Sequence, residues 1–279
     1  MNRRLVLFFL LMLPFSAIAQ TVKGKVYTES TVQDPLAFVN IGIIGTTVGT
    51  VSDEEGYFTL PFRKEHLNKQ VRFSIIGYKS KEYKLDNLLN QFNEIKMEKD
   101  TVQLNKIVVT DFRLKKKDKG TKTSSKRIVT GWNRYILGGE RGIRIKVGSK
   151  PISVKSLHFH VANNGFKKVL LRLHFRNFKD GVPFRHVVNS DIIIPVNIKS
   201  GWVNVDLEEY DLVFEEDVAV TLQPVHRTGE CLEQENCFHL SLGMFRIFSP
   251  NWLVYKISSE ADWEIKKIYS PGIYLSVYE

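Results

Sequence analysis

The chain has 279 residues and a formal net charge of +10, with 43% hydrophobic and 25% charged residues. This composition is typical of globular proteins, so we expect a packed core rather than a disordered chain, and the length is a little long for one domain and suits two. Eight basic residues and one acidic residue lie between Arg113 and Arg127, and Arg3 and Arg4 lie near the N-terminus. The remaining chain is close to neutral. The positive charge therefore belongs to local segments and does not indicate a nucleic-acid-binding surface.

The first 19 residues have the pattern of a secretory signal peptide. Residues 2–4 are polar and basic, residues 5–13 are an apolar run, and residues 17–19 form a small-x-small motif. The run is shorter than the roughly 18 apolar residues that a transmembrane helix needs. We therefore expect cleavage after Ala19, no transmembrane span, and a location in the periplasm, at the outer membrane or outside the cell.

Residues 20–111 have the pattern of a first β-sandwich. Short strands, separated by turn signals every 8–12 residues, are typical of this architecture. The predicted strands begin at residue 22 and include residues 36–44, 57–60 and 71–76. One short helix-like stretch covers residues 85–92.

Three motifs of this segment carry a family resemblance. They are Thr21-Val-Lys-Gly-Lys-Val, Pro35-Leu-Ala-Phe-Val-Asn-Ile and Asp53-Glu-Glu-Gly-Tyr-Phe. Together they resemble the carboxypeptidase-regulatory-like domain. The resemblance implies a seven-stranded, transthyretin-like sandwich that accompanies zinc carboxypeptidases but has no active site of its own. The same module precedes the plug of many TonB-dependent transporters, and residues 104–111 are similar to the segment that follows it there.

Residues 112–127 are basic and contain Ser, Thr and Gly, with no apolar periodicity. Such a composition predicts a flexible linker between two domains.

Residues 128–279 have the pattern of a second β-sandwich. About nine strand-like segments alternate with turns, without a helical period, which favours a jelly roll. The order of segments 170–175, 201–207 and 218–224 resembles that of a galactose-binding-like jelly roll. The predicted fold class is all-β, with two β-sandwich domains joined by the flexible basic linker.

Cys231 and Cys237 are the two cysteines of the chain. In an oxidising compartment they are expected to form a disulfide. The intervening Leu-Glu-Gln-Glu-Asn is turn-like, so we predict a stapled hairpin tip. A metal site would need two more ligands close by.

No motif predicts catalysis, a cofactor or a metal. The sequence has neither a His-Glu-x-x-His motif nor a Gly-x-Ser-x-Gly elbow. His158 and His160 share one strand face, and three imidazoles would meet if His174 lay on the adjacent strand. We expect ordinary strand histidines instead. The acidic residues between Asp206 and Asp217 would suit Ca²⁺ as oxygen ligands, but a solvated connection is the simpler interpretation.

The candidate ligand site is aromatic. Sugar rings stack on exposed aromatic faces while neighbouring polar groups bind the hydroxyls. Trp252 and Trp263 lie at predicted junctions between loops and strands, and Arg246, Asn251 and Tyr255 are polar candidates near them. The simpler interpretation is that these aromatic rings pack in the core of the sandwich.

The resulting hypothesis is a non-enzymatic, exported envelope protein that binds a glycan or peptide in its second domain, or binds another envelope protein. One alternative is a scaffold or assembly partner of outer-membrane transport machinery. The other is a metal-dependent hydrolase whose motif is not recognised.

Overall fold

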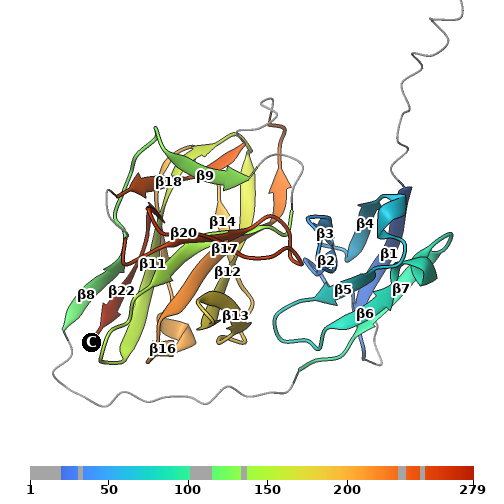
Figure 1. Ribbon diagram of the computed structural model, residues 1–279, viewed down its shortest axis with the longest axis horizontal. Helices are drawn as coiled ribbons and strands as arrows, with labels where there is room; N and C mark the ends of the chain where they lie inside the picture. The colour runs from blue at the N-terminus through green and yellow to red at the C-terminus, as the bar shows by residue number, and fades with distance from the viewer. Residues whose placement is uncertain (1–19, 31–33, 101–114, 133–136, 232–236, 246–248) are drawn as a thin grey trace, which may run out of the picture.

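The computed structural model describes residues 20–30, 34–100, 115–132, 137–231, 237–245 and 249–279. These residues form β-strands and three short 3₁₀ turns, with no α-helix among them. Two domains lie side by side, one before residue 101 and one after residue 114 (Figure 1). The predicted all-β class is confirmed. The predicted signal peptide with its cleavage site after Ala19, and residues 104–111, lie outside the described residues.

The first domain contains seven strands in two sheets, as the family resemblance implied. One sheet has the order β4-β1-β7 and the other has the order β3-β2-β5-β6. β1 and β7 pair in parallel, and the other pairs are antiparallel. The strands are β1 (Gln20–Thr28), β2 (Asn40–Ile43), β3 (Gly49–Val51), β4 (Tyr57–Phe62), β5 (Gln70–Ser74), β6 (Lys81–Lys84) and β7 (Phe92–Met97). The helix-like stretch is a single 3₁₀ turn, Leu85–Leu88.

Alternating side chains of these strands form the core of the first domain. Phe58, Leu60 and Phe62 of β4 are buried while the residues between them are exposed. Phe58 meets Phe73 of β5, with ring centroids 5.4 Å apart. This period of two is what places one face of each sheet inside.

The second domain is a larger sandwich of two sheets. The seven-stranded sheet has the order β13-β12-β17-β10-β19-β20, with β14 paired to β12. The eight-stranded sheet has the order β21-β18-β11-β22-β8, with β15 and β16 paired to β11 and β9 paired to β18. The strands are β8 (Lys116–Gly120), β9 (Val129–Trp132), β10 (Glu140–Ile145), β11 (Ile152–Asn164), β12 (Lys168–Lys179), β13 (Val182–His186), β14 (Ile192–Val196), β15 (Gly201–Asp206), β16 (Val213–Phe214), β17 (Val218–Thr228), β18 (Phe238–Met244), β19 (Leu253–Lys256), β20 (Glu264–Lys266), β21 (Tyr269–Pro271) and β22 (Ile273–Tyr278).

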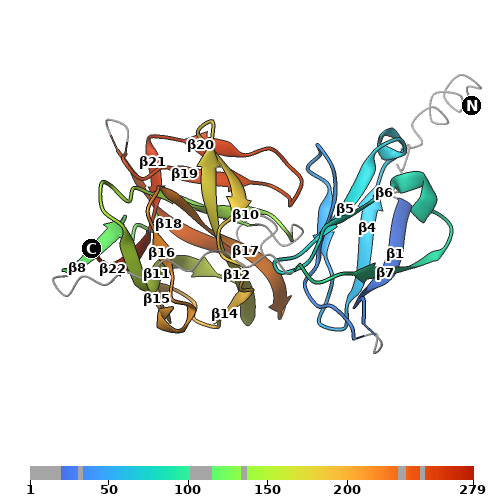
Figure 2. The ribbon, with the colours of Figure 1, turned by 90° about the horizontal axis from the view of Figure 1, so that it is seen from below.

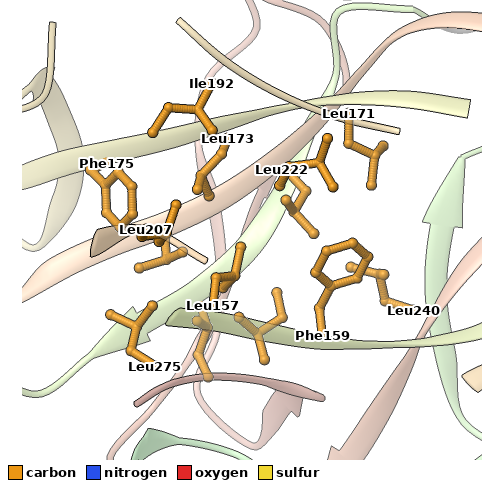
Figure 3. Packing of buried hydrophobic residues seen from close by; sticks show 14 of the residues in the cluster. Leu157, Phe159, Leu171, Leu173, Phe175, Ile192, Leu207, Leu222, Leu240 and Leu275 are labelled. Atoms are coloured by element: carbon orange, nitrogen blue, oxygen red, sulfur yellow. The ribbon is translucent and has the colours of Figure 1, made fainter. Parts of the chain in front are cut away.

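Its apolar core lies between the two sheets. Leu157 and Phe159 of β11 point toward Leu171, Leu173 and Phe175 of β12 (Figure 3). All five side chains are almost fully buried. Because alternate residues of a strand face opposite sides, the residues between them lie on the outer faces of the two sheets.

The prediction of a flexible linker over residues 112–127 is wrong for β8. This basic strand pairs antiparallel with β22 at the edge of the eight-stranded sheet. Lys117 and Lys119 both bind the carboxylate of Glu279, which holds the pKa of Glu279 at about 2. Backbone pairing to a free sheet edge does not require apolar residues, so the sequence pattern did not reveal the strand.

The predicted disulfide between Cys231 and Cys237 is present, with both cysteines buried. The hairpin prediction is wrong, because β17 before it lies in the seven-stranded sheet and β18 after it lies in the eight-stranded sheet. The disulfide therefore closes a connection that crosses from one sheet to the other.

The three histidines do not meet. β11, which carries His158 and His160, belongs to a different sheet from β12, which carries His174. His158 Nδ1 lies 2.5 Å from Asn204 Oδ1, and His160 Nδ1 lies 2.8 Å from the Ser241 hydroxyl. The first two histidines are thus strand residues with polar partners.

The first domain packs its four-stranded sheet against the outer face of the seven-stranded sheet, while β1 and β7 lie on the far side (Figure 2). A small apolar cluster forms where the two domains meet. Its members are Phe38, Val51, Leu137, Leu170, Ile193 and Val225. Polar contacts surround this cluster, so the two domains are joined by direct contact as well as by the chain.

Arg172 of β12 makes the central polar contact of this interface. Its side chain is fully buried; Nε and Nη2 donate to the Asp191 carboxylate at 2.5 and 2.9 Å, and Nη1 donates to the Phe38 carbonyl at 2.8 Å. Phe38 has a φ of 59°, a left-handed conformation that is unfavourable for a bulky residue. The buried Ser52 hydroxyl stabilises this turn by accepting from Val39 N and donating to Leu36 O.

Replacing Arg172 should loosen the interface. We expect Arg172→Met to lower the free energy of unfolding by about 3 kcal/mol, because it leaves the Asp191 carboxylate and the Phe38 carbonyl without their donor. Hydrogen exchange followed by mass spectrometry should show faster exchange in residues 36–44. Arg144→Met, which breaks an ion pair with Asp217 inside the second domain, is the control and should leave that segment unchanged.

Removing the disulfide should destabilise the second domain moderately. The cysteines are 6 residues apart, so the loop-entropy model gives a loss of about 2 kcal/mol for Cys231→Ser. Urea unfolding of the oxidised protein measures this loss. The pairing predicts no labelled thiol in the denatured wild type under non-reducing conditions and one in the variant, so two labelled thiols in the wild type would contradict it.

Candidate functional site

A pocket of about 840 Å³ lies between the two domains. The first domain contributes residues of β2 and β5 and the segment 75–80 that follows β5. The second domain contributes residues of β10, β12, β13 and β19, together with the segment 259–263. Its volume is within the range of small-molecule sites. Neither domain encloses this space alone.

Glu140 is the buried carboxylate of the pocket. Only 1% of its surface is exposed. Its Oε1 lies 2.8 Å from Arg176 Nη2 and 3.0 Å from Lys256 Nζ, while Oε2 accepts from the Thr221 hydroxyl at 2.6 Å. The strand pairings bring these residues together, because β10, β12, β17 and β19 are neighbours in one sheet. Alternation on each strand turns the polar residues to the outer face.

The charges of this cluster stabilise one another. Burial alone would raise the pKa of Glu140, but Arg176 and other nearby positive charges lower it well below its usual value. Burial lowers the pKa of Lys256, and Glu140 opposes that effect. Removing one partner of such a buried group leaves an uncompensated charge, which is strongly destabilising.

Trp263 covers this cluster. Its ring lies 4.9 Å from Lys256 Nζ and 5.7 Å from the Arg176 guanidinium carbon, and it lines the pocket. Two cations beside one indole ring hold its orientation by cation–π attraction. The half-buried ring gives the pocket an aromatic surface beside polar groups.

His174 and His186 lie together on the second-domain side, with ring centroids 5.0 Å apart. His174 Nε2 lies 3.1 Å from Gln223 Oε1. Burial lowers the pKa of His174 to about 3 and lowers the pKa of His186 well below its usual value. Both rings are therefore neutral at physiological pH.

An ion pair between the domains borders the pocket. Arg72 of β5 lies 2.8 Å from Glu82 and 2.8 Å from Glu260, which belongs to the second domain. Burial raises the pKa of Glu260, and Arg72 partly offsets the effect. Arg72 and Glu260 thus place opposite charges from the two domains next to each other at the pocket.

The structure brings one described residue of the predicted aromatic site, Trp263, into the pocket. Trp252 packs between Arg144 and Lys267, at 4.3 and 4.9 Å from its ring. Asn251 Nδ2 donates to Gly120 O, and the Tyr255 hydroxyl lies 2.5 Å from Glu264 Oε2. Arg246 lies outside the described residues. Asn251, Trp252 and Tyr255 are not among the residues that line this pocket.

Sequence reasoning missed Glu140, Arg176, Lys256 and the first-domain wall. The available signal was the alternation in Leu171-Arg-Leu-His-Phe-Arg, which puts Arg172, His174 and Arg176 on one face. Read alone, such a face appears solvated. Only the docking of the first domain shows that it is covered.

In the described part of the chain, no group of three or more His, Cys, Asp or Glu residues could hold a metal ion. Two of the acidic residues that would suit Ca²⁺ have other partners. The Asp206 carboxylate accepts a hydrogen bond from Glu208 N, and the Asp217 carboxylate accepts from Arg144 and from Val147 N. Nor do the described residues contain a helix that is long and apolar enough to cross a membrane.

The buried histidines should make stability depend on pH. The folded-state pKa of His174, about 3, lies below its unfolded value of about 6.5, so the unfolded chain binds the proton first. Stability should therefore fall as the pH drops below 6.5 and continue to fall until about 3. From pH 7 to pH 5 we expect His174 to account for about 2 kcal/mol. Urea unfolding of wild type and His174→Gln tests this, and an equal pH dependence in both would contradict it.

The comparisons with known proteins bear on the first domain. Residues 22–109 match the family model described as the CarboxypepD_reg-like domain. No curated protein matches the chain. A solved structure containing the cysteine protease and lectin-like domains of Cwp84, a surface layer associated protein of Clostridium difficile, is similar with a TM-score of 0.38 and 10% identity. The similarity covers 94% of this chain but 58% of that chain, so this chain spans little more than half its length. The predicted family is confirmed for the first domain: residues 22–109 are a CarboxypepD_reg-like domain.

Proposed function

We propose that this chain is a non-enzymatic, exported protein of the cell envelope that binds a polar ligand, a glycan or a peptide, in the pocket between its two domains. The observation that carries the proposal is the shared pocket itself. It has an aromatic surface, Trp263, beside polar groups from both domains. This combination of one apolar face and a few placed polar groups is typical of ligand sites.

The state of the charged groups supports binding rather than catalysis. Glu140 is engaged by Arg176, Lys256 and Thr221, so its carboxylate is occupied as a structural counter-ion. A general base at neutral pH needs a pKa near 7, whereas Glu140 and His174 have pKa values shifted below their usual ranges.

Export is supported by the disulfide between Cys231 and Cys237. Disulfides persist in oxidising compartments and are rare in the cytosol. The signal-peptide pattern of residues 1–19 favours the same location.

A scaffold function is the second candidate, and one observation favours it. Tyr57 and Phe92 are 47% and 57% exposed on the far sheet of the first domain, with ring centroids 6.4 Å apart. Exposed aromatic pairs are common in protein-binding surfaces. A partner protein bound there would leave the pocket free.

The test is a binding screen of the purified two-domain protein against glycan and peptide arrays. Trp263→Ala should weaken binding about tenfold, because the ligand loses an aromatic contact surface. Trp252→Ala is the matched control, since this tryptophan also packs against two cations but lies outside the pocket. Equal binding by wild type and Trp263→Ala would place the ligand elsewhere, and loss in a Tyr57→Ser variant would favour the scaffold function.

A further inference from the structure

We propose that the second domain docks on the surface of an anionic lipid bilayer through a tip at the end of β18. The apolar part of this lipid-binding tip consists of Met244, Phe245 and Ile268. Its basic part consists of the cations in segments 126–127 and 266–267. None of these residues lines the interdomain pocket, so the inference goes beyond the function proposed for the pocket.

Exposed apolar side chains gather at the tip. Eight large hydrophobic residues of the described chain are exposed, and Met244, at 60%, is the most exposed of them. Phe245 and Ile268 belong to the same set, with 39% and 40% of their surface exposed. Single exposed apolar residues are normal on a protein surface, whereas several in one place mark an interaction site. The tip is therefore a surface that a partner covers.

The tip is a two-stranded ribbon with apolar residues on both faces. Met244 of β18 pairs with Tyr269 of β21, and Phe245 N donates to Ile268 O at 2.9 Å. Consecutive residues of a strand point to opposite faces, so Met244 lies on one face while Phe245 and its partner Ile268 lie on the other. β18 runs antiparallel to β9 and ends on the side of the second domain that is turned away from the first domain (Figure 1). Contact at the tip therefore leaves the first domain clear of the docked surface.

Basic side chains flank the ribbon. Segments 126–127 and 264–268 contain four basic residues and one acidic residue, Glu264. All four basic side chains are exposed. Leu242 N donates to Ile128 O at 3.0 Å, which places the first segment alongside the end of β18, and the second segment leads into the ribbon. The tip therefore combines apolar side chains with an excess of positive charge.

This charge favours a lipid surface over a second copy of the chain. Lys266 lies 3.4 Å from Glu264, but both side chains are about half exposed, so water screens the pair and it contributes little. In a symmetric dimer each tip would meet the same cations of the other copy, and the like charges would repel. The phosphate head groups of an anionic bilayer instead attract cations that lie close to its surface.

The exposure of both faces favours a bilayer over a protein partner. A flat protein surface would cover Met244 or the pair of Phe245 and Ile268, but not both sides of the ribbon. The interfacial region of a bilayer surrounds what enters it, so it can bury apolar side chains on both faces. Apolar burial and attraction to anionic lipids together give reversible attachment without a membrane span.

The experiment is co-sedimentation of the two-domain protein with vesicles of phosphatidylcholine, with or without phosphatidylglycerol. Wild type should bind the vesicles that contain phosphatidylglycerol and not those of phosphatidylcholine alone. Added salt should weaken binding, because it screens the exposed cations. Lys126→Gln, Lys266→Gln and Phe245→Ser should each weaken partitioning about fivefold. No binding of wild type to phosphatidylglycerol vesicles, or equal binding by these three variants, would overturn the inference.

Matched control variants test the location. Lys96→Gln and Phe92→Ser remove an exposed cation and an exposed aromatic ring from β7 of the first domain, and both should bind vesicles like wild type. Trp263→Ala, in the pocket, should also bind vesicles like wild type, because the two sites are separate. Vesicle binding that is lost in the β7 variants and kept in the tip variants would assign the lipid contact to the first domain and contradict the inference.

A fluorescent label tests insertion and covers the case in which a variant fails to fold. The two native cysteines form the disulfide, so Met244→Cys introduces a single thiol for an environment-sensitive fluorophore at an exposed position. Its emission should shift to the blue on phosphatidylglycerol vesicles, whereas the same label on Phe92→Cys should not respond. An unchanged emission at position 244 would overturn the inference. A blue shift without vesicles that grows with protein concentration would do the same, since a second copy of the chain would then cover the tip.

Discussion

One fully buried guanidinium, that of Arg172, joins the two domains of this protein. It is held by Asp191 within the second domain and donates its remaining group to the carbonyl of Phe38 in the first. Phe38 has a left-handed backbone conformation, and this aims its carbonyl across the interface. Burying a guanidinium is energetically costly unless each of its N–H donors has an acceptor. The first domain must therefore dock so that the Phe38 carbonyl reaches Arg172. The docked arrangement also encloses the pocket between the two domains.

The outer face of the seven-stranded sheet has an unusual composition for a surface that becomes buried. A small apolar cluster around Val225 lies beside the polar residues Gln223, Thr221 and Glu140. The face of the sheet that meets the first domain therefore changes from apolar to polar. Where the domains touch, Arg172 and Gln223 of the second domain donate to Phe38 O and Asn40 Oδ1 of the first. Where they diverge, polar residues of both domains line a space of about 840 Å³. The outward-facing residues of the same strands therefore form both the apolar contact between the domains and the polar lining of the pocket.

This arrangement gives the CarboxypepD_reg-like domain a physical role in this chain. It closes one wall of the pocket and positions Arg72 against Glu260. Glu140 and Lys256 are buried, and the low local dielectric strengthens the electrostatic contact between them. A ligand bound in the pocket would contact both domains and so would stabilise their docked arrangement.

The sequence by itself determined the β-class, the two domains, the family of the first, and the disulfide, because strand periodicity, turn residues and paired cysteines are local signals. It also contained the alternation of Arg172, His174 and Arg176 that builds the pocket wall. Only the tertiary structure decided that this face is covered, that β8 pairs with the edge of β22, and that Trp263 rather than Trp252 lines the pocket. Such features depend on contacts between residues far apart in the chain, such as Phe38 with Arg172, and no local periodicity encodes which distant surface will cover a polar strand face.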